Sequence, residues 1–165
     1  MITPELHRPV RLDRFGPDAT VQEVDASDEE CRALAERFGI PAVLSLRCRL
    51  TLRRLSRDVV AGSGQLTAQV VRVCGVTLDN FEMDVTEAFS VRFVPEGTES
   101  ADIDPETEDE IPYSGDVIDL GEAAAEQLAL ALKPYPRRPG AELAIGEQEP
   151  EVHPFAALEE LRRRH

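Results

Sequence analysis

The sequence predicts an α+β fold in which an antiparallel sheet packs against about three helices. Two stretches, residues 43–55 and 81–93, alternate between apolar and polar side chains, a period typical of strands with one buried face. Apolar residues at helical spacing instead occupy residues 31–38, 120–132 and 154–163. Strands clustered in the middle of the chain favour antiparallel pairing, and a partly closed barrel is the alternative that this pattern leaves open.

The first part of the chain predicts short strands and a capped helix. Residues 1–17 form an extended segment that ends at a Gly-Pro pair, and residues 19–26 are a second strand candidate. Ser27 and Glu30 make a capping box, in which a hydroxyl and a carboxylate bond to free N–H groups at the start of a helix. We expect Gly39 to end that helix.

The first long strand carries arginines on its polar side. Arg47, Arg49 and Arg53 alternate with buried positions and point toward solvent. They are the candidate footprint for direct RNA binding, because Lys and Arg displace counterions from phosphates. Glu82 and Asp84, expected on a neighbouring strand, oppose this interpretation because acids opposite these arginines would pair with them.

The next two strands are expected to contain irregular positions. Gly62 and Gly64 flank a serine and predict a turn, which a central strand over residues 66–73 follows. On the strand over residues 81–93, Glu87 interrupts the apolar row. This favours a β-bulge, or the exposure of one sheet face at that position, over a functional carboxylate.

Residues 95–117 predict a long mobile acidic loop, because they contain proline and glycine and few large apolar groups. Its acids are candidates for holding a basic protein partner by complementary charge. The candidate residues are Asp102, Asp104, Glu106, Glu108, Asp109 and Glu110. A solvated linker without a partner is the alternative interpretation.

Residues 133–140 read Lys-Pro-Tyr-Pro-Arg-Arg-Pro-Gly and are called the arm below. Its prolines remove N–H donors and fix φ, so we expect a stiff surface segment rather than a helix or a central strand. Tyr135, Arg137 and Arg138 are candidates for a more specific contact with RNA phosphate or with an acidic protein group. The alternative is a rigid strap over the edge of the sheet.

Length and composition favour one domain over residues 1–165, with a C-terminal helix at 154–163. A hydrophobic content of 42% is enough for a core and disfavours wholesale disorder. No apolar run predicts a membrane span and no signal-peptide pattern opens the sequence, so we expect a cytoplasmic protein. The net charge of −14 disfavours general binding to nucleic acid.

The residues available for catalysis are few. The three histidines are far apart in the sequence, and none has a cysteine or acid at a ligand spacing. Cys31, Cys48 and Cys74 are predicted to be buried free thiols. No motif for a nucleophile, a phosphate or a dinucleotide is present. We therefore expect no enzymatic activity, no cofactor, no metal and no small-molecule substrate.

Three segments, residues 69–93, 117–140 and 153–161, together resemble the YceD family of bacterial and plastid proteins. The middle segment, with Asp-Leu-Gly-Glu and the arm, is the most specific, and it is similar to the alphaproteobacterial branch. The resemblance implies a non-enzymatic role in the accumulation of large-subunit ribosomal RNA and in ribosome assembly. It implies as partner a basic ribosomal protein or a large-subunit assembly intermediate, with contact to ribosomal RNA as the alternative.

The resemblance also shows one departure from other branches of the family. Those branches carry cysteines and a histidine in an arrangement that looks like a zinc site. Here Cys74 remains, but Thr77, Arg138 and Leu143 stand at the other positions and are poor zinc ligands. We hypothesise that packing has replaced a metal as the clasp between the sheet and the arm.

Overall fold

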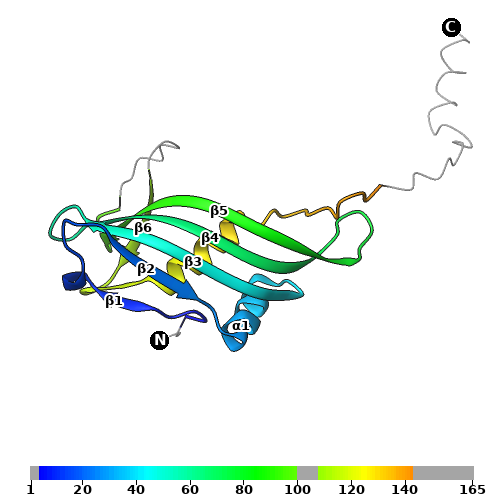
Figure 1. The fold of residues 1–165 in the computed structure, drawn as a ribbon, viewed down its shortest axis with the longest axis horizontal. Helices are drawn as coiled ribbons and strands as arrows, with labels where there is room; N and C mark the ends of the chain where they lie inside the picture. Colours follow the sequence, from blue (N-terminus) through cyan, green and yellow to red (C-terminus); the bar gives the residue numbers. More distant parts are fainter. Residues whose placement is uncertain (1–3, 100–107, 143–165) are drawn as a thin grey trace, which may run out of the picture.

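A computed structural model describes residues 4–99 and 108–142, which form a five-stranded sheet, a two-stranded sheet and two α-helices (Figure 1). The strand order is β2-β3-β4-β5-β6 in the large sheet, and β1 pairs with β7. The elements are β1 (Pro9–Arg11), the 3₁₀ helix η1 (Leu12–Arg14), β2 (Thr20–Asp25), α1 (Asp28–Phe38), β3 (Ala42–Arg54), β4 (Val60–Val73), β5 (Asn80–Pro95), β6 (Asp109–Tyr113), β7 (Val117–Asp119) and α2 (Leu120–Ala131).

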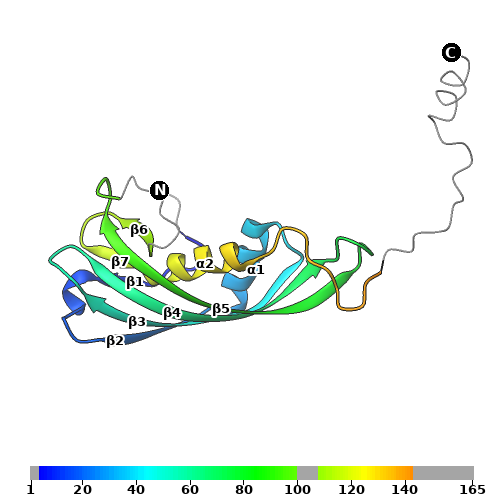
Figure 2. The same ribbon diagram turned by 90° about the horizontal axis from the view of Figure 1, so that it is seen from above.

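The large sheet has one covered and one open face. Figure 2 shows α1, α2 and the β1–β7 pair on the same side of the curved sheet. On β3 the side chains alternate as the sequence predicts: Leu46, Cys48, Leu50 and Leu52 are at most 2% exposed, whereas the intervening side chains face water. The core therefore lies between this inner face and the helices, and the outer face of the sheet is polar.

The predicted capping box of α1 is confirmed. The Glu30 N–H donates to the Ser27 hydroxyl at 3.3 Å, and the Ser27 N–H donates to the Glu30 carboxylate at 2.8 Å. Gly39 ends the helix in the left-handed conformation, with a φ of 62°. Between these ends, Cys31 and Leu34 are buried against the sheet, so α1 is fixed in direction by both its caps and its apolar side.

The α+β class is confirmed, but the sheet differs from the expected one in two ways. It is open, since β2 and β6 lie at its two ends, so the barrel alternative is wrong. β6 also pairs with β5 in parallel rather than antiparallel. Two of the three expected helices are present in the described part of the chain, and the helix predicted over residues 154–163 lies outside it.

The loop predicted over residues 95–117 is corrected in its second half, where β6 and the start of β7 are formed. The composition of this segment suggested a solvated loop because acids and a proline flank the two side chains that reach the core. Ile111 packs against the core, and Tyr113 is buried and donates its hydroxyl to the Asp58 carbonyl at 2.7 Å. The sequence composition predicted that this backbone is hydrated. Its N–H and C=O groups instead pair with β5, and the contacts of Ile111 and Tyr113 hold the segment in place.

The turn predicted at Gly62 and Gly64 is also wrong, because both glycines lie within β4. A Cβ atom at Gly64 would stand 2.2 Å from the ring of Phe89, so the missing side chain leaves room for this aromatic on the inner face. The β-bulge expected at Glu87 is absent from the β4–β5 ladder, which keeps one register throughout. Glu87 is instead exposed on the inner-face row, which is the other outcome that the sequence left open.

Candidate functional site

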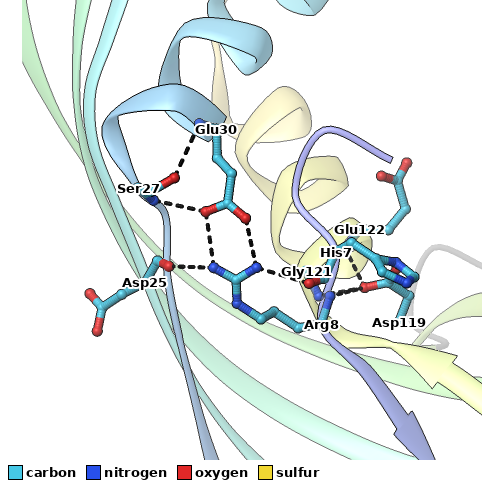
Figure 3. A network of polar contacts seen from close by, with 8 residues as sticks. All are labelled: His7, Arg8, Asp25, Ser27, Glu30, Asp119, Gly121 and Glu122. Carbon is cyan, nitrogen blue, oxygen red and sulfur yellow. Dashed lines mark hydrogen bonds and ion pairs between the residues drawn. The ribbon is translucent and has the colours of Figure 1, made fainter. Parts of the chain in front are cut away.

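The segment before β1 is tied to both helices by a polar network (Figure 3). Arg8 makes a two-pronged ion pair with Glu30 of α1, with N···O distances of 2.7 and 2.9 Å, and also donates to the Asp25 carbonyl at 2.8 Å. The hydrogen bonds from Arg8 lower the pKa of Glu30 to about 2. This pair holds the start of the chain against the end of β2 and the first turn of α1.

Asp119 forms the other half of this network at the start of α2. Its Oδ1 atom accepts the N–H groups of Gly121 at 3.0 Å and Glu122 at 3.2 Å, as a helix N-cap does. The same oxygen accepts the Arg8 N–H at 2.8 Å, and the other carboxylate oxygen bonds to His7. The carboxylate of Asp119 is therefore occupied by structural contacts.

The Asp-Leu-Gly-Glu motif is explained by these contacts. A Cβ atom at Gly121 would lie 2.5 Å from the carbonyl oxygen of Leu6, so only glycine lets the N-terminal segment approach the helix this closely. Glu122 binds Arg37 of α1 at 2.6 and 2.8 Å and raises the pKa of that guanidinium. The motif joins α1, α2 and the N-terminal segment, and none of its carboxylates is free for chemistry.

The arm is clasped to the turn between β4 and β5. The Gly75 N–H donates to the Pro136 carbonyl at 2.9 Å, and Arg72 donates to the Lys133 carbonyl at 2.8 Å. The Arg138 N–H points at the Cys74 sulfur at 3.4 Å. These hydrogen bonds join the arm to the sheet.

Cys74 lies at the centre of this clasp as a buried thiol. The Arg138 backbone N–H and, to a smaller extent, the neighbouring Thr77 lower the pKa of Cys74 to about 6. No cluster of three or more metal-ligating side chains occurs within residues 4–99 and 108–142. Cys31 and Cys48 are also buried and free, and burial raises the pKa of Cys48 to about 12.

The arm presents its predicted contact residues unequally. Tyr135 is 84% exposed and Arg137 is exposed. Arg138 is less available to a partner because it already makes two contacts within the fold. Its guanidinium lies 3.8 Å from the Asp79 carboxylate, and its backbone N–H points at the Cys74 sulfur. Near this clasp, Leu78 is 76% exposed and has a positive φ of 62°. Tyr135 and Arg137 are therefore the arm residues that a partner reaches without breaking the fold.

The acidic candidates divide into two groups. Glu108, Asp109 and Glu110 lie at the start of β6, where Glu108 approaches the Arg92 guanidinium at 4.0 Å. Glu108 and Asp109 are exposed, whereas Glu110 is half-buried. The other three candidates, Asp102, Asp104 and Glu106, lie outside the described residues.

The arginine face differs from the predicted one in its partners. Arg47 binds Asp25 of β2 at 2.5 Å. Arg49 and Arg53 make no ion pair with any residue of the described ranges. The expected pairing of these arginines with Glu82 and Asp84 is wrong. Those acids lie on β5, and β4 separates β5 from β3. Acids nevertheless share this outer face, namely Glu23, Asp25, Glu82 and Asp84, so it is not a continuous basic surface.

The comparison with known families decides what the chain is related to. Residues 62–162, more than half of the chain, match the family described as large ribosomal RNA subunit accumulation protein YceD. The chain belongs to the YceD family. No curated protein and no solved structure matched it. Within the described ranges, none of the helices is both long and apolar enough to cross a membrane.

The YceD match separates the two candidate surfaces. It begins within β4 and includes β5, β6, α2 and the arm. Tyr135 and Arg137 therefore lie inside the matched region, whereas Arg47, Arg49 and Arg53 on β3 lie outside it. The family match therefore covers the arm and does not extend to the arginine face.

The arm and the acids of β6 lie at opposite ends of β5. The arm contacts the turn that precedes Asn80, and Asp109 is the register partner of Val91 (Figure 1). At about 3.3 Å per residue, this separation along the strand is about 36 Å. One compact ligand cannot touch both places, but an extended partner can.

Sequence reasoning missed the N-terminal network almost entirely. Arg8 and Asp119 are 111 positions apart, and no short sequence motif predicts a contact between them. The one available signal was local: helical spacing predicted a helix over residues 120–132, and Asp119 caps that helix. Contacts between segments that are far apart in the sequence cannot be identified without the three-dimensional structure.

Proposed function

We propose that this YceD protein supports the accumulation of large-subunit ribosomal RNA by binding a basic ribosomal protein or another assembly partner, without catalysing a reaction. The observation that carries the proposal is the family match over residues 62–162. The net charge of −14 adds to it, because an acidic protein attracts basic partners and repels bare RNA.

Two exposed surfaces support binding to a protein. Glu108 and Asp109 present carboxylates at the start of β6, and the arm presents Tyr135 and Arg137 at the far end of β5. Aromatic and arginine side chains are enriched among residues that dominate protein interfaces. We expect the acids to speed encounter in a salt-dependent way and the arm to give the more specific contact.

A non-catalytic role agrees with how the titratable groups of the N-terminal network and of the clasp are used. The carboxylates of Glu30, Asp119 and Glu122 are bound to arginines or helix N–H groups. The thiol of Cys74 is buried beneath the arm. Groups committed to the fold in this way are not poised to meet a substrate.

The test is a cell without the gene, in which we expect a lower ratio of large-subunit to small-subunit ribosomal RNA. Reintroducing the wild-type chain should restore the ratio. A tagged chain should recover a basic large-subunit protein or a precursor particle at near-physiological salt. A normal RNA ratio in the gene's absence would contradict the proposal.

Two variants locate the surface without damaging the fold. Neutralising Glu108 and Asp109 to their amides removes charge but keeps β6, and Arg137→Glu reverses an exposed charge beside the clasp. Each should reduce recovery of the partner. The matched control is Arg32→Glu, at an exposed residue of α1 outside the matched region. Recovery of RNA alone, lost on changing Arg49 and Arg53, would favour the direct RNA-binding alternative instead.

A further inference from the structure

β5 has a long edge without a neighbouring strand. β4 pairs with it from Asn80 to Phe93, whereas β6 pairs on the other side only from Val91 to Pro95. Along residues 80–90 the described ranges supply no partner strand and no other backbone hydrogen bond to this side (Figure 1). Every second residue of an antiparallel strand directs its N–H and C=O away from its partner, so about five residues offer unused donors and acceptors here.

The side chains around this edge are acidic. Glu82 and Asp84 stand on its outer face and Glu87 on its inner face, and all three are exposed. Within the described ranges none of these three acids has an ion-pair partner. Glu108 and Asp109 continue the row where β6 begins. A strand edge flanked by acids on both faces favours an occupant with alternating basic side chains.

The edge also borders an open hollow of about 640 Å³ between β5, the start of β6 and the end of α2. Its lining includes the half-buried ring of Phe89 and Leu130, which is 72% exposed. A strand added to β5 would place alternate side chains over this hollow. The hollow therefore offers an occupant apolar contacts at Phe89 and Leu130. Three acids and one base, Lys133, complete its charged lining.

The chain's own acidic segment is a poor occupant. Continuing the parallel register backward from the Val91–Asp109 pair would set Asp104 and Glu106 beside residues 86–88 of β5, next to Glu87. Acids would then face acids, and Pro105 has no N–H to donate. Charge and backbone chemistry both favour a basic segment from another molecule.

We propose that the edge of β5 over residues 80–90 binds a basic, extended segment of a protein partner by strand addition. This rests on the proposed function and gives it a surface and a mode of binding. Backbone hydrogen bonds supply affinity, and the flanking acids select lysine and arginine. An occupant of this edge runs from the arm toward Glu108 and Asp109, so it joins the two surfaces that the sequence predicted separately.

A synthetic peptide of about eleven residues, in which lysine alternates with valine and threonine, tests the mode of binding on the full chain. A second peptide keeps the charge but carries prolines that interrupt the strand, and a third replaces lysine by glutamate. We expect the first to bind at near-physiological salt and to slow amide exchange within residues 80–90. The other two should bind at least tenfold more weakly. Equal binding of the proline peptide would overturn strand addition.

A variant in which three acids are replaced by their amides tests whether the acids of this edge contribute to binding. Glu82→Gln, Asp84→Asn and Glu87→Gln together should weaken binding of the basic peptide about tenfold, as expected for three exposed charge contacts. The matched control removes three exposed acids elsewhere, at Asp18, Glu23 and Glu36, and should change the affinity less than twofold. Equal losses in both variants would mean that only net charge acts, and would overturn the proposal.

The same variant in cells separates this inference from the proposed function. If loss of the gene lowers large-subunit RNA but the variant at Glu82, Asp84 and Glu87 restores it fully, the edge is not the binding surface although the function stands. If loss of the gene has no effect, the function fails whatever the peptides do. Protection of residues 80–90 by an RNA oligonucleotide, but not by the basic peptide, would overturn the assignment to a protein partner. Binding by neither would overturn the proposal, and the acids would then serve to prevent pairing of this edge with another copy of the chain.

Discussion

Gly121→Ala is the substitution whose effect the structure predicts most sharply. An alanine normally stabilises a helix by about 1 kcal/mol relative to glycine, so local propensity predicts a gain. In this fold the new Cβ atom would lie 2.5 Å from the Leu6 carbonyl oxygen, 2.8 Å from its carbon and 3.0 Å from the Arg8 nitrogen. All three neighbours are backbone atoms, so the N-terminal segment must move away from α2.

The expected loss follows from what that movement breaks. The segment would give up the hydrogen bonds from Leu120 N–H to the Arg8 carbonyl and from Arg8 N–H to Asp119, at about 1 kcal/mol each. It would also expose Leu6, which is fully buried, at about 2 kcal/mol. After the gain of about 1 kcal/mol in propensity, the net destabilisation is about 3 kcal/mol.

Urea unfolding followed by circular dichroism measures this difference. Ala129→Gly, at an exposed position of the same helix, should cost about 1 kcal/mol and calibrates propensity alone. A chain that lacks residues 1–8 also lacks the backbone atoms that the new Cβ would approach. Gly121→Ala should therefore be neutral or stabilising in that chain. Full-length Gly121→Ala as stable as wild type would refute the close-packing explanation.

Three further predictions concern other contacts of the fold. Glu30→Gln should destabilise by about 1–2 kcal/mol at neutral pH, after allowance for the partial exposure of Arg8. Because folding lowers the pKa of Glu30 from 4.5 to about 2, this contribution is complete above pH 4.5, and the difference between wild type and variant in urea unfolding should vanish as the pH falls toward 2. Folding also lowers the pKa of Cys74 from 9.0 to about 6, so the stability of wild type relative to Cys74→Ala should grow from pH 6 to pH 9; a constant difference would argue against a stabilised thiolate. Gly64→Ala should lower the melting temperature because its Cβ meets the Phe89 ring at 2.2 Å, and adding Phe89→Leu should recover part of the loss.

Local patterns predicted the parts of the fold that local physics controls. The alternation on β3 identified its buried face because strand geometry places successive side chains on opposite sides. Ser27 and Glu30 identified the start of α1 because the capping contacts lie within one turn. Helical spacing over residues 120–132 likewise identified α2, which Asp119 caps.

The failures share a different physical origin. Gly62 and Gly64 were interpreted as a turn, although their small size accommodates Phe89 from β5, a contact that no local pattern records. β6 was assigned to a loop because its neighbours are acidic, whereas burial of Tyr113 and pairing with β5 outweigh that composition. The partner of Arg47 was sought on β5 because strand order is not encoded in periodicity.

The candidate site was predictable in its residues more than in its arrangement. Tyr135 and Arg137 of the arm are exposed, as the proline-rich composition predicted. Arg138 is held by Cys74 and Asp79, a distinction that its sequence neighbour Arg137 does not reveal. The free edge of β5 could not be predicted, because an unpaired edge depends on which strands the remainder of the sheet supplies.

A photo-crosslinking residue in place of Thr86, at the centre of the free edge, tests the central claim most directly. The matched control is the same substitution at Thr67, its register partner on β4, which is also exposed but has strands on both sides. In living cells we predict a crosslink from position 86 to a lysine- and arginine-rich segment of a large-subunit protein. Neutralising Glu82, Asp84 and Glu87 should strongly reduce the yield of this crosslink. Crosslinks to RNA at position 86, or equal crosslinking at both positions, would contradict the account.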